Sequence, residues 1–102
     1  MLFQVTMFPT DNKGPSASDD VSRVVDIIDK SGLPYRLTAM CTIIEGGWEP
    51  VMKVINRARL MLRRRHSRIY ISIIVDDRKG AQGRLTGKIT SVEKRLKREV
   101  KK

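Results

Sequence analysis

The stretch PYRLTAMCTIIEGG, residues 34–47, decides the fold of this 102-residue chain. Residues 34–45 mix apolar and β-branched side chains, which favours extended structure, and the pair Gly46-Gly47 ends the run. The run is long for one straight strand, so we expect a bulge or turn near residues 40–42 to split it into a hairpin. Two strands are therefore expected here.

The flanking segments alternate between strand and helix patterns. Residues 2–8 read as a strand, and residues 69–76 as a second one with a wholly aliphatic face. Residues 77–87 read as a loop. Apolar side chains at helical spacing predict three helices, around Val21, Val24, Val25 and Ile28, from Trp48 to about Arg65, and around Ile89, Val92 and Leu96.

This order of elements predicts an α+β fold, a ferredoxin-like βαββαβ sandwich with an additional C-terminal helix. We expect residues 1–102 to form a single domain, with a basic tail from about residue 97 that frays. Two helices would cover one sheet face and leave the other with a large apolar patch. Self-association as a homodimer or homotetramer would cover that patch.

The first residues and the composition indicate the cellular location of the protein and whether a membrane is its partner. The first residues, MLFQVTMFPTDNKG, lack a secretory signal pattern, and no apolar run reaches the roughly 20 residues of a membrane helix. The single cysteine, Cys41, agrees with a reducing compartment. We therefore expect a cytoplasmic protein without a membrane partner.

The formal net charge of +10 leaves two interpretations open. The cations are either solvated helix faces and tails, or a surface for nucleic acid. They gather in two segments, at Arg57, Arg59, Arg63, Arg64, Arg65 and Arg68, and at Lys94, Arg95, Lys97, Arg98, Lys101 and Lys102. Only 5% of the residues are aromatic, which provides few platforms on which single-stranded nucleic acid could stack.

No catalytic pattern stands out, and we expect no enzyme. His66 is the only histidine, and we expect it on the surface at the end of a helix. One cysteine and one histidine cannot supply a usual zinc site, and Asp76-Asp77 is more typical of a loop cap than of a metal site. Gly46-Gly47 precedes a helix but matches no phosphate-loop pattern.

Polar side chains interrupt apolar strands at two places. Thr38, Thr42 and Glu45 lie in the first, and residues 76–78 end the most aliphatic strand. Ligand sites combine an apolar wall with a few polar groups, so these interruptions are the candidate site.

Residues 35–46, YRLTAMCTIIEG, followed by Trp48 and Glu49, resemble the signature of the thiamine-binding-protein-like family, small domains long catalogued as uncharacterised. Residues 74–78, IVDDR, resemble its strand-end DDR, and residues 88–93, KITSVE, its C-terminal K-[VI]-x-S-V-E. With Phe8-Pro9 and SGLPY at 31–35, the similarity spans nearly the whole chain in the right order. Each motif is weak, and together they are fairly specific.

The resemblance implies a ferredoxin-like fold, sheet-to-sheet dimers often paired into tetramers, and no established catalysis. It implies thiamine or its hydroxymethylpyrimidine portion as the ligand, in a pocket near a subunit interface, and no other cofactor. A hydroxyl such as that of Thr42 and a carboxylate such as that of Glu45 suit an aminopyrimidine, while Met40 packs on the ring. The site residues it implies are Thr38, Met40, Thr42, Glu45, Gly46, Asp76 and Asp77.

Three positions depart from the family pattern, which has proline at Ala39, glycine at Cys41 and an acidic residue at Gly47. A glycine permits positive φ or close backbone approach, so Cys41 adds a side chain where we expect the bend to need space. We therefore expect an altered pocket.

Overall fold

The computed structural model describes residues 1–11, 17–80 and 83–100. Its elements alternate along the chain as the sequence predicts. In order, they are β1 (Leu2–Pro9), α1 (Ala17–Lys30), β2 (Tyr35–Leu37), β3 (Thr42–Glu45), α2 (Trp48–Arg63), β4 (Ile69–Asp76) and α3 (Arg84–Leu96).

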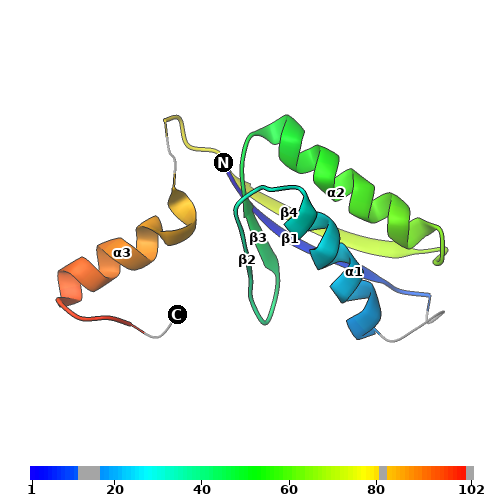
Figure 1. The fold of residues 1–102 in the computed structure, drawn as a ribbon, viewed down its shortest axis with the longest axis horizontal. Helices are drawn as coiled ribbons and strands as arrows, with labels where there is room; N and C mark the ends of the chain where they lie inside the picture. Colours follow the sequence, from blue (N-terminus) through cyan, green and yellow to red (C-terminus); the bar gives the residue numbers. More distant parts are fainter. Residues whose placement is uncertain (12–16, 81–82, 101–102) are drawn as a thin grey trace.

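The strands form one antiparallel sheet in the order β2-β3-β1-β4 (Figure 1). Helices α1 and α2 lie side by side on one face of this sheet. This confirms the α+β ferredoxin-like sandwich with an additional C-terminal helix.

The decisive run does split into a hairpin, with its turn at residues 38–41 because Leu37 and Thr42 form the last β2–β3 pair. The hairpin is short. Strand β3 pairs with β1 only from Leu2 to Val5, whereas β4 pairs with β1 as far as Pro9. From Thr6 onward, β1 therefore has no strand neighbour on its β3 side.

Strand alternation separates a buried face of the sheet from an open one. Phe3, Val5 and Met7 of β1 point toward α1 and α2, as does Ile44 of β3. They form the core with apolar residues of both helices, Val24, Ile28, Val51, Val54, Ile55, Ala58 and Leu62. Each large side chain buried in this way stabilises the fold by about 1.5–3 kcal/mol.

The opposite face of the sheet exposes large apolar side chains. Tyr70 is 54% exposed and Ile74 is 58% exposed. Phe8 lies opposite Tyr70 in the β1–β4 ladder, with ring centroids 5.2 Å apart. In the part of the chain that the structure describes, α1 and α2 both lie on the other face of the sheet (Figure 1).

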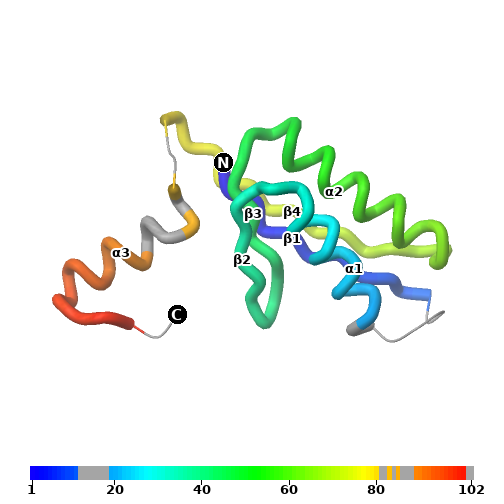
Figure 2. Tube along the Cα trace, viewed as in Figure 1, coloured from blue at the N-terminus to red at the C-terminus, as the bar shows by residue number. Residues whose placement is uncertain are grey.

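Helix α3 extends away from the layer formed by α1 and α2, as the trace in Figure 2 shows. The radius of gyration is 15.3 Å, against about 13 Å for a compact domain of this length. The helix begins at Arg84, inside the segment expected to be a loop, and ends at Leu96, after which Lys97 adopts φ 58°. The expected basic tail starts there, and its last two residues lie outside the described part.

Among the described residues, no helix is both long and apolar enough to cross a membrane.

Candidate functional site

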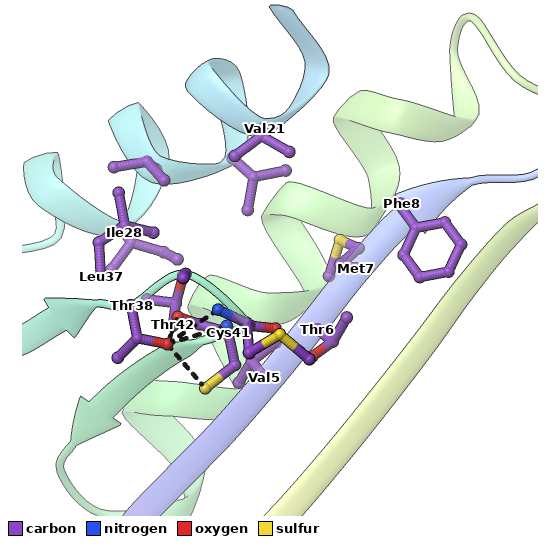
Figure 3. Close-up of a pocket in the computed structure, with 14 residues that line it drawn as sticks. Val5, Thr6, Met7, Phe8, Val21, Ile28, Leu37, Thr38, Cys41 and Thr42 are labelled. Atoms are coloured by element: carbon purple, nitrogen blue, oxygen red, sulfur yellow. Dashed lines mark hydrogen bonds between the residues drawn. The ribbon is translucent and has the colours of Figure 1, made fainter. Parts of the chain in front are cut away.

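A cavity of about 180 Å³ opens below α1, beside the turn between β2 and β3 (Figure 3). Its walls come from three elements that are distant in sequence. They are residues 5–8 of β1, residues 37–42 of the hairpin, and Val21, Val24, Val25 and Ile28 of α1. Most of this wall is aliphatic.

The short hairpin creates the cavity, because β3 ends where β1 continues. Two backbone hydrogen bonds show which side of β1 each residue faces. On the β3 side, Gly46 N–H donates to the Met1 carbonyl at 3.0 Å. On the β4 side, Thr10 N–H donates to the Arg68 carbonyl at 3.0 Å. Backbone groups of an antiparallel strand alternate between its two sides. The alternation places the N–H and C=O of Met7 on the side where β3 is missing, next to the cavity that Met7 lines.

The Thr38 hydroxyl organises the turn. It donates to the Cys41 carbonyl at 3.0 Å and accepts from Met40 N–H at 3.2 Å and Cys41 N–H at 3.1 Å (Figure 3). A hydroxyl has one donor and two acceptor positions, so these bonds use its full capacity. Thr38 therefore shapes the cavity wall and has no hydrogen bond left for a ligand.

Thr42 differs from Thr38 in having an available hydroxyl. Its side chain lines the cavity and is only 7% exposed. Within residues 1–11, 17–80 and 83–100, no group hydrogen-bonds this hydroxyl. Among the described residues, the fully buried side-chain atoms that lack a hydrogen-bond partner are Asp20 Oδ2 and Arg23 Nη1, so the Thr42 oxygen is open to the cavity and can bond a ligand.

Met40 and Cys41 complete the turn. The Met40 side chain is 84% exposed at the tip of the hairpin, and its carbonyl lies 3.5 Å from the Thr6 hydroxyl. The Cys41 sulfur lies 3.4 Å from the Thr38 oxygen and lines the cavity. No residue of the turn has positive φ. The backbone thus accepts Cys41 without strain, although its side chain takes up space in the cavity.

The other predicted site residues lie elsewhere. Glu45 and Asp76 both pair with Leu2, one from each side, so they share the open face of the sheet. Thr42 points to the opposite, helix-covered face, because its separation of three from Glu45 is an odd number of strand positions. The chain by itself therefore does not bring Thr42 and Glu45 to one pocket. Asp77 follows β4 and is exposed.

Gly46 has a packing role in this structure. A Cβ atom at this position would lie 2.9 Å from Val51 Cγ2 of α2 and 3.4 Å from Leu33 Cδ2. Gly47, where the resemblance suggests an acidic residue, is the N-cap of α2 and makes no side-chain capping bond. An acidic side chain there would accept a hydrogen bond from the N–H groups in the first turn of α2, so the acidic residue of the family pattern is compatible with helix capping.

His66 is buried, and the expectation of a surface position was wrong. It is 2% exposed, with Nδ1 2.9 Å from Asp11 Oδ1 and Nε2 3.3 Å from Asp20 Oδ1. Asp11 also accepts from the Ser67 amide at 2.6 Å, and Arg63 donates to the His66 carbonyl at 2.7 Å. We call Asp11, Asp20 and His66 the histidine clasp. It joins the end of β1, the start of α1 and the turn before β4.

The hydrogen bond to Asp11 raises the pKa of His66 above its usual value of 6.5. The bond to Asp20 and both carboxylate charges add to the rise, while burial opposes it. The charged imidazolium is thereby favoured in the folded protein. In the part of the chain that the structure describes, no group of three or more His, Cys, Asp or Glu side chains could hold a metal ion.

Comparison with known proteins identifies the family. The sequence profile of the thiamine-binding protein family matches residues 3–93. The chain belongs to the thiamine-binding protein family. Among its relatives, the UPF0045 protein Mb1933 of Mycobacterium bovis is 36% identical over 86 residues, covering 83% of this chain and 84% of the relative. The UPF0045 protein YqgV of Bacillus subtilis is 32% identical, covering 93% and 96%.

Solved structures share the fold of this family member. A hypothetical protein of Methanocaldococcus jannaschii superposes with a TM-score of 0.78 at 24% identity, covering 89% of this chain and 93% of that one. A Thermotoga maritima protein, whose name proposes a role in thiamine biosynthesis or salvage, has a TM-score of 0.77 at 18% identity and covers 89% and 96%.

Sequence reasoning missed two parts of the cavity. The first is the apolar stripe of α1, whose Val21 and Val25 line the cavity and are not part of the core cluster. The second is the main chain of Met7, which becomes available only because the hairpin is short. The length of the hairpin depends on where its turn begins. The hydrogen bonds of Thr38 fix that position, and the sequence alone does not predict them.

Proposed function

We propose that this chain binds the pyrimidine portion of a thiamine-like ligand, without chemical turnover, in the cavity below α1. The observation that carries the proposal is the unpartnered hydroxyl of Thr42 inside an apolar cavity. Ligand sites have this composition, with apolar walls and a few oriented polar groups.

The size of the cavity favours one ring. A protein cavity of about 150 Å³ holds benzene, and this one measures about 180 Å³. A substituted pyrimidine therefore fits, whereas the second ring of thiamine would lie outside. The exposed Met40 side chain at the rim is placed to fold over the bound ring, where its polarisable sulfur packs well on an aromatic face.

The polar groups at the cavity match an aminopyrimidine. Such a ring carries a donor amine beside an acceptor nitrogen. Met7 offers an acceptor C=O and a donor N–H on its open side, the pair that another strand would otherwise use. Thr42 adds a hydroxyl that both donates and accepts.

Charge favours the neutral pyrimidine over whole thiamine. The second ring of thiamine is a cation, this chain carries a net charge of +10, and none of the described residues that line the cavity is acidic. Repulsion between like charges would weaken the binding of thiamine. We expect hydroxymethylpyrimidine to bind more tightly than thiamine.

The family assignment supports this class of ligand, and so does the name of the Thermotoga maritima protein. The proposal of a non-catalytic role rests on His66. It is the only histidine of the sequence, and both of its ring nitrogens face carboxylates of the buried clasp. It is therefore not available to transfer a proton to a ligand.

We further propose that a second copy covers the open sheet face, giving a homodimer or, with α3, a homotetramer. Tyr70 and Ile74 are more than half exposed, and α3 extends away from α1 and α2 (Figure 1). A stripe at helical spacing on α3, Leu85, Ile89, Val92 and Leu96, provides the apolar contact such an assembly needs. Sedimentation should give a dimer or tetramer, and Ile74→Glu should dissociate it. A wild-type monomer at micromolar concentration would contradict this part.

Isothermal titration calorimetry tests the ligand. We expect saturable binding of hydroxymethylpyrimidine, weaker binding of thiamine, and weaker binding still of a pyrimidine that lacks the amine. The last ligand is a matched control, because it fills the cavity without pairing with Met7. The absence of any heat or thermal shift with hydroxymethylpyrimidine at millimolar concentration would overturn the proposal.

A further inference from the structure

A second surface, separate from the cavity, carries a concentration of unpaired cations. Residues 50–75 contain no aspartate or glutamate, yet they include a lysine and six arginines. Five of these cations are exposed and form no ion pair or side-chain hydrogen bond within the described residues. We call them the basic stripe: Lys53, Arg57, Arg64, Arg65 and Arg68.

The geometry of α2 aligns this stripe. At 100° per residue, Lys53, Arg57 and Arg64 fall within an arc of about 40° on one side of the helix and extend over about 16 Å. Arg65 and Arg68 follow in the turn to β4. The opposite side of α2 is buried in the core, which fixes the stripe outward.

Local stability does not explain these charges. Cations in the last turn of a helix interact favourably with its dipole, which accounts for Arg63 to Arg65. Lys53 and Arg57 lie further from that end, where the dipole has little effect, and like charges four residues apart repel each other. By contrast, the basic residues at the end of α3 are interspersed with Glu93 and Glu99.

We propose that the basic stripe binds duplex nucleic acid through its phosphate backbone. Arginine forks match phosphate geometry, and a duplex presents a charge about every 1.7 Å of its axis. Single strands bind partly by stacking on aromatic rings. Of the exposed aromatic residues, Trp48 lies at the far end of α2, while Phe8 and Tyr70 lie on the open face of the sheet.

A membrane surface fits the stripe less well. A helix at a lipid interface inserts an apolar side beneath its basic one. The apolar side of α2 is already buried in the core, and Leu60 alone is exposed along the stripe.

The experiment measures the affinity of the full chain for a labelled 20-base-pair duplex, as DNA and as RNA, between 50 and 200 mM salt. We expect micromolar affinity at low salt, and a slope of log affinity against log salt of about −0.9 for each phosphate contact. The triple variant K53Q/R57Q/R64Q should reduce the magnitude of the slope by about 3.

The triple variant K30Q/R36Q/K94Q is the matched control, because it removes equal charge from α1, β2 and α3. It should keep the wild-type slope. Equal slopes in the two variants would show that only net charge matters and would overturn the proposal. Absence of duplex binding at 50 mM salt, or binding to phosphatidylserine vesicles in its place, would also overturn it. No α2 residue lines the cavity, so this result is independent of pyrimidine binding.

Discussion

The histidine clasp and the hairpin cavity both place polar groups against α1, and they differ in what those groups contact. In the clasp, both ring nitrogens of His66 face carboxylates, and Asp11 is held further by Ser67. At the cavity, the hydroxyl of Thr38 is saturated, but that of Thr42 has no partner among the described residues.

This difference distinguishes polar groups that hold the fold together from polar groups that are able to bind a ligand. Polar groups that contact one another in the interior specify and stabilise one conformation, whereas a hydroxyl that faces a cavity without a partner in the chain can bond a ligand. The clasp therefore fixes the start of α1. The cavity beside the same helix retains the capacity to bind.

Removing the clasp histidine should have the largest effect. His66→Ala leaves Asp20 buried without its cationic partner, and an uncompensated buried carboxylate is strongly destabilising. The variant should show the greatest loss of melting temperature among those described here. Ser67→Ala, which removes one hydrogen bond to Asp11, is the control and should lose much less. Equal melting temperatures for wild type and His66→Ala would contradict a stabilising clasp.

The pH dependence of stability should report on the same histidine. The pKa of His66 is raised in the folded protein, chiefly by the hydrogen bond to Asp11. The resulting stabilisation is fully present below the unfolded pKa of 6.5 and is lost as pH rises through the higher folded value. Thermal melts should therefore show a fall in stability as pH increases above 6.5. His66→Ala should remove that fall, and persistence of the fall in the variant would assign it to other groups.

Thr38→Val should have an intermediate effect. It removes the hydroxyl that bonds the Cys41 carbonyl and the amides of residues 40 and 41. Because the turn is exposed, water replaces part of this bonding, and we expect a loss of about 1–2 kcal/mol in denaturant unfolding. Thr38→Ser keeps the hydroxyl and should retain most of the stability. If both variants unfold alike, the hydroxyl does not hold the turn.

Cys41→Gly should lower the stability of the protein slightly and raise its affinity for the ligand. The added backbone freedom costs about 0.5–1 kcal/mol. Loss of the sulfur from the cavity wall should raise the affinity for hydroxymethylpyrimidine in calorimetric titrations. Cys41→Ala is the matched control, since it removes the same sulfur without the backbone freedom of glycine. Tighter binding in Cys41→Gly but not in Cys41→Ala would point to turn flexibility and away from cavity space.

Much of the fold followed from periodicity. The helical spacing of Val21 to Ile28 and the alternation of residues 69–76 were sufficient to predict α1 and β4, and the length of residues 34–45 predicted the hairpin. The position of the turn at residues 38–41 depends on bonds made by Thr38, which composition does not reveal. The early start of α3 at Arg84 was also missed, because its first turn contains residues typical of a loop.

The site was less predictable than the fold. Family motifs are linear, and they grouped Thr42 with Glu45, although strand alternation places the two side chains on opposite faces of the sheet. His66 was misplaced because its partners, Asp11 and Asp20, are 55 and 46 residues away in the sequence. Such long-range pairing depends on the tertiary fold, which one sequence does not specify residue by residue.

The most direct test is Thr42→Val, with unfolding and hydroxymethylpyrimidine binding measured on the same protein. Valine has nearly the shape of threonine and removes only the unpaired hydroxyl. We predict unchanged or slightly higher stability, together with a roughly tenfold loss of affinity, equivalent to about 1.4 kcal/mol. Wild-type affinity in Thr42→Val, or a clear loss of its stability, would contradict the assignment of Thr42 to ligand binding.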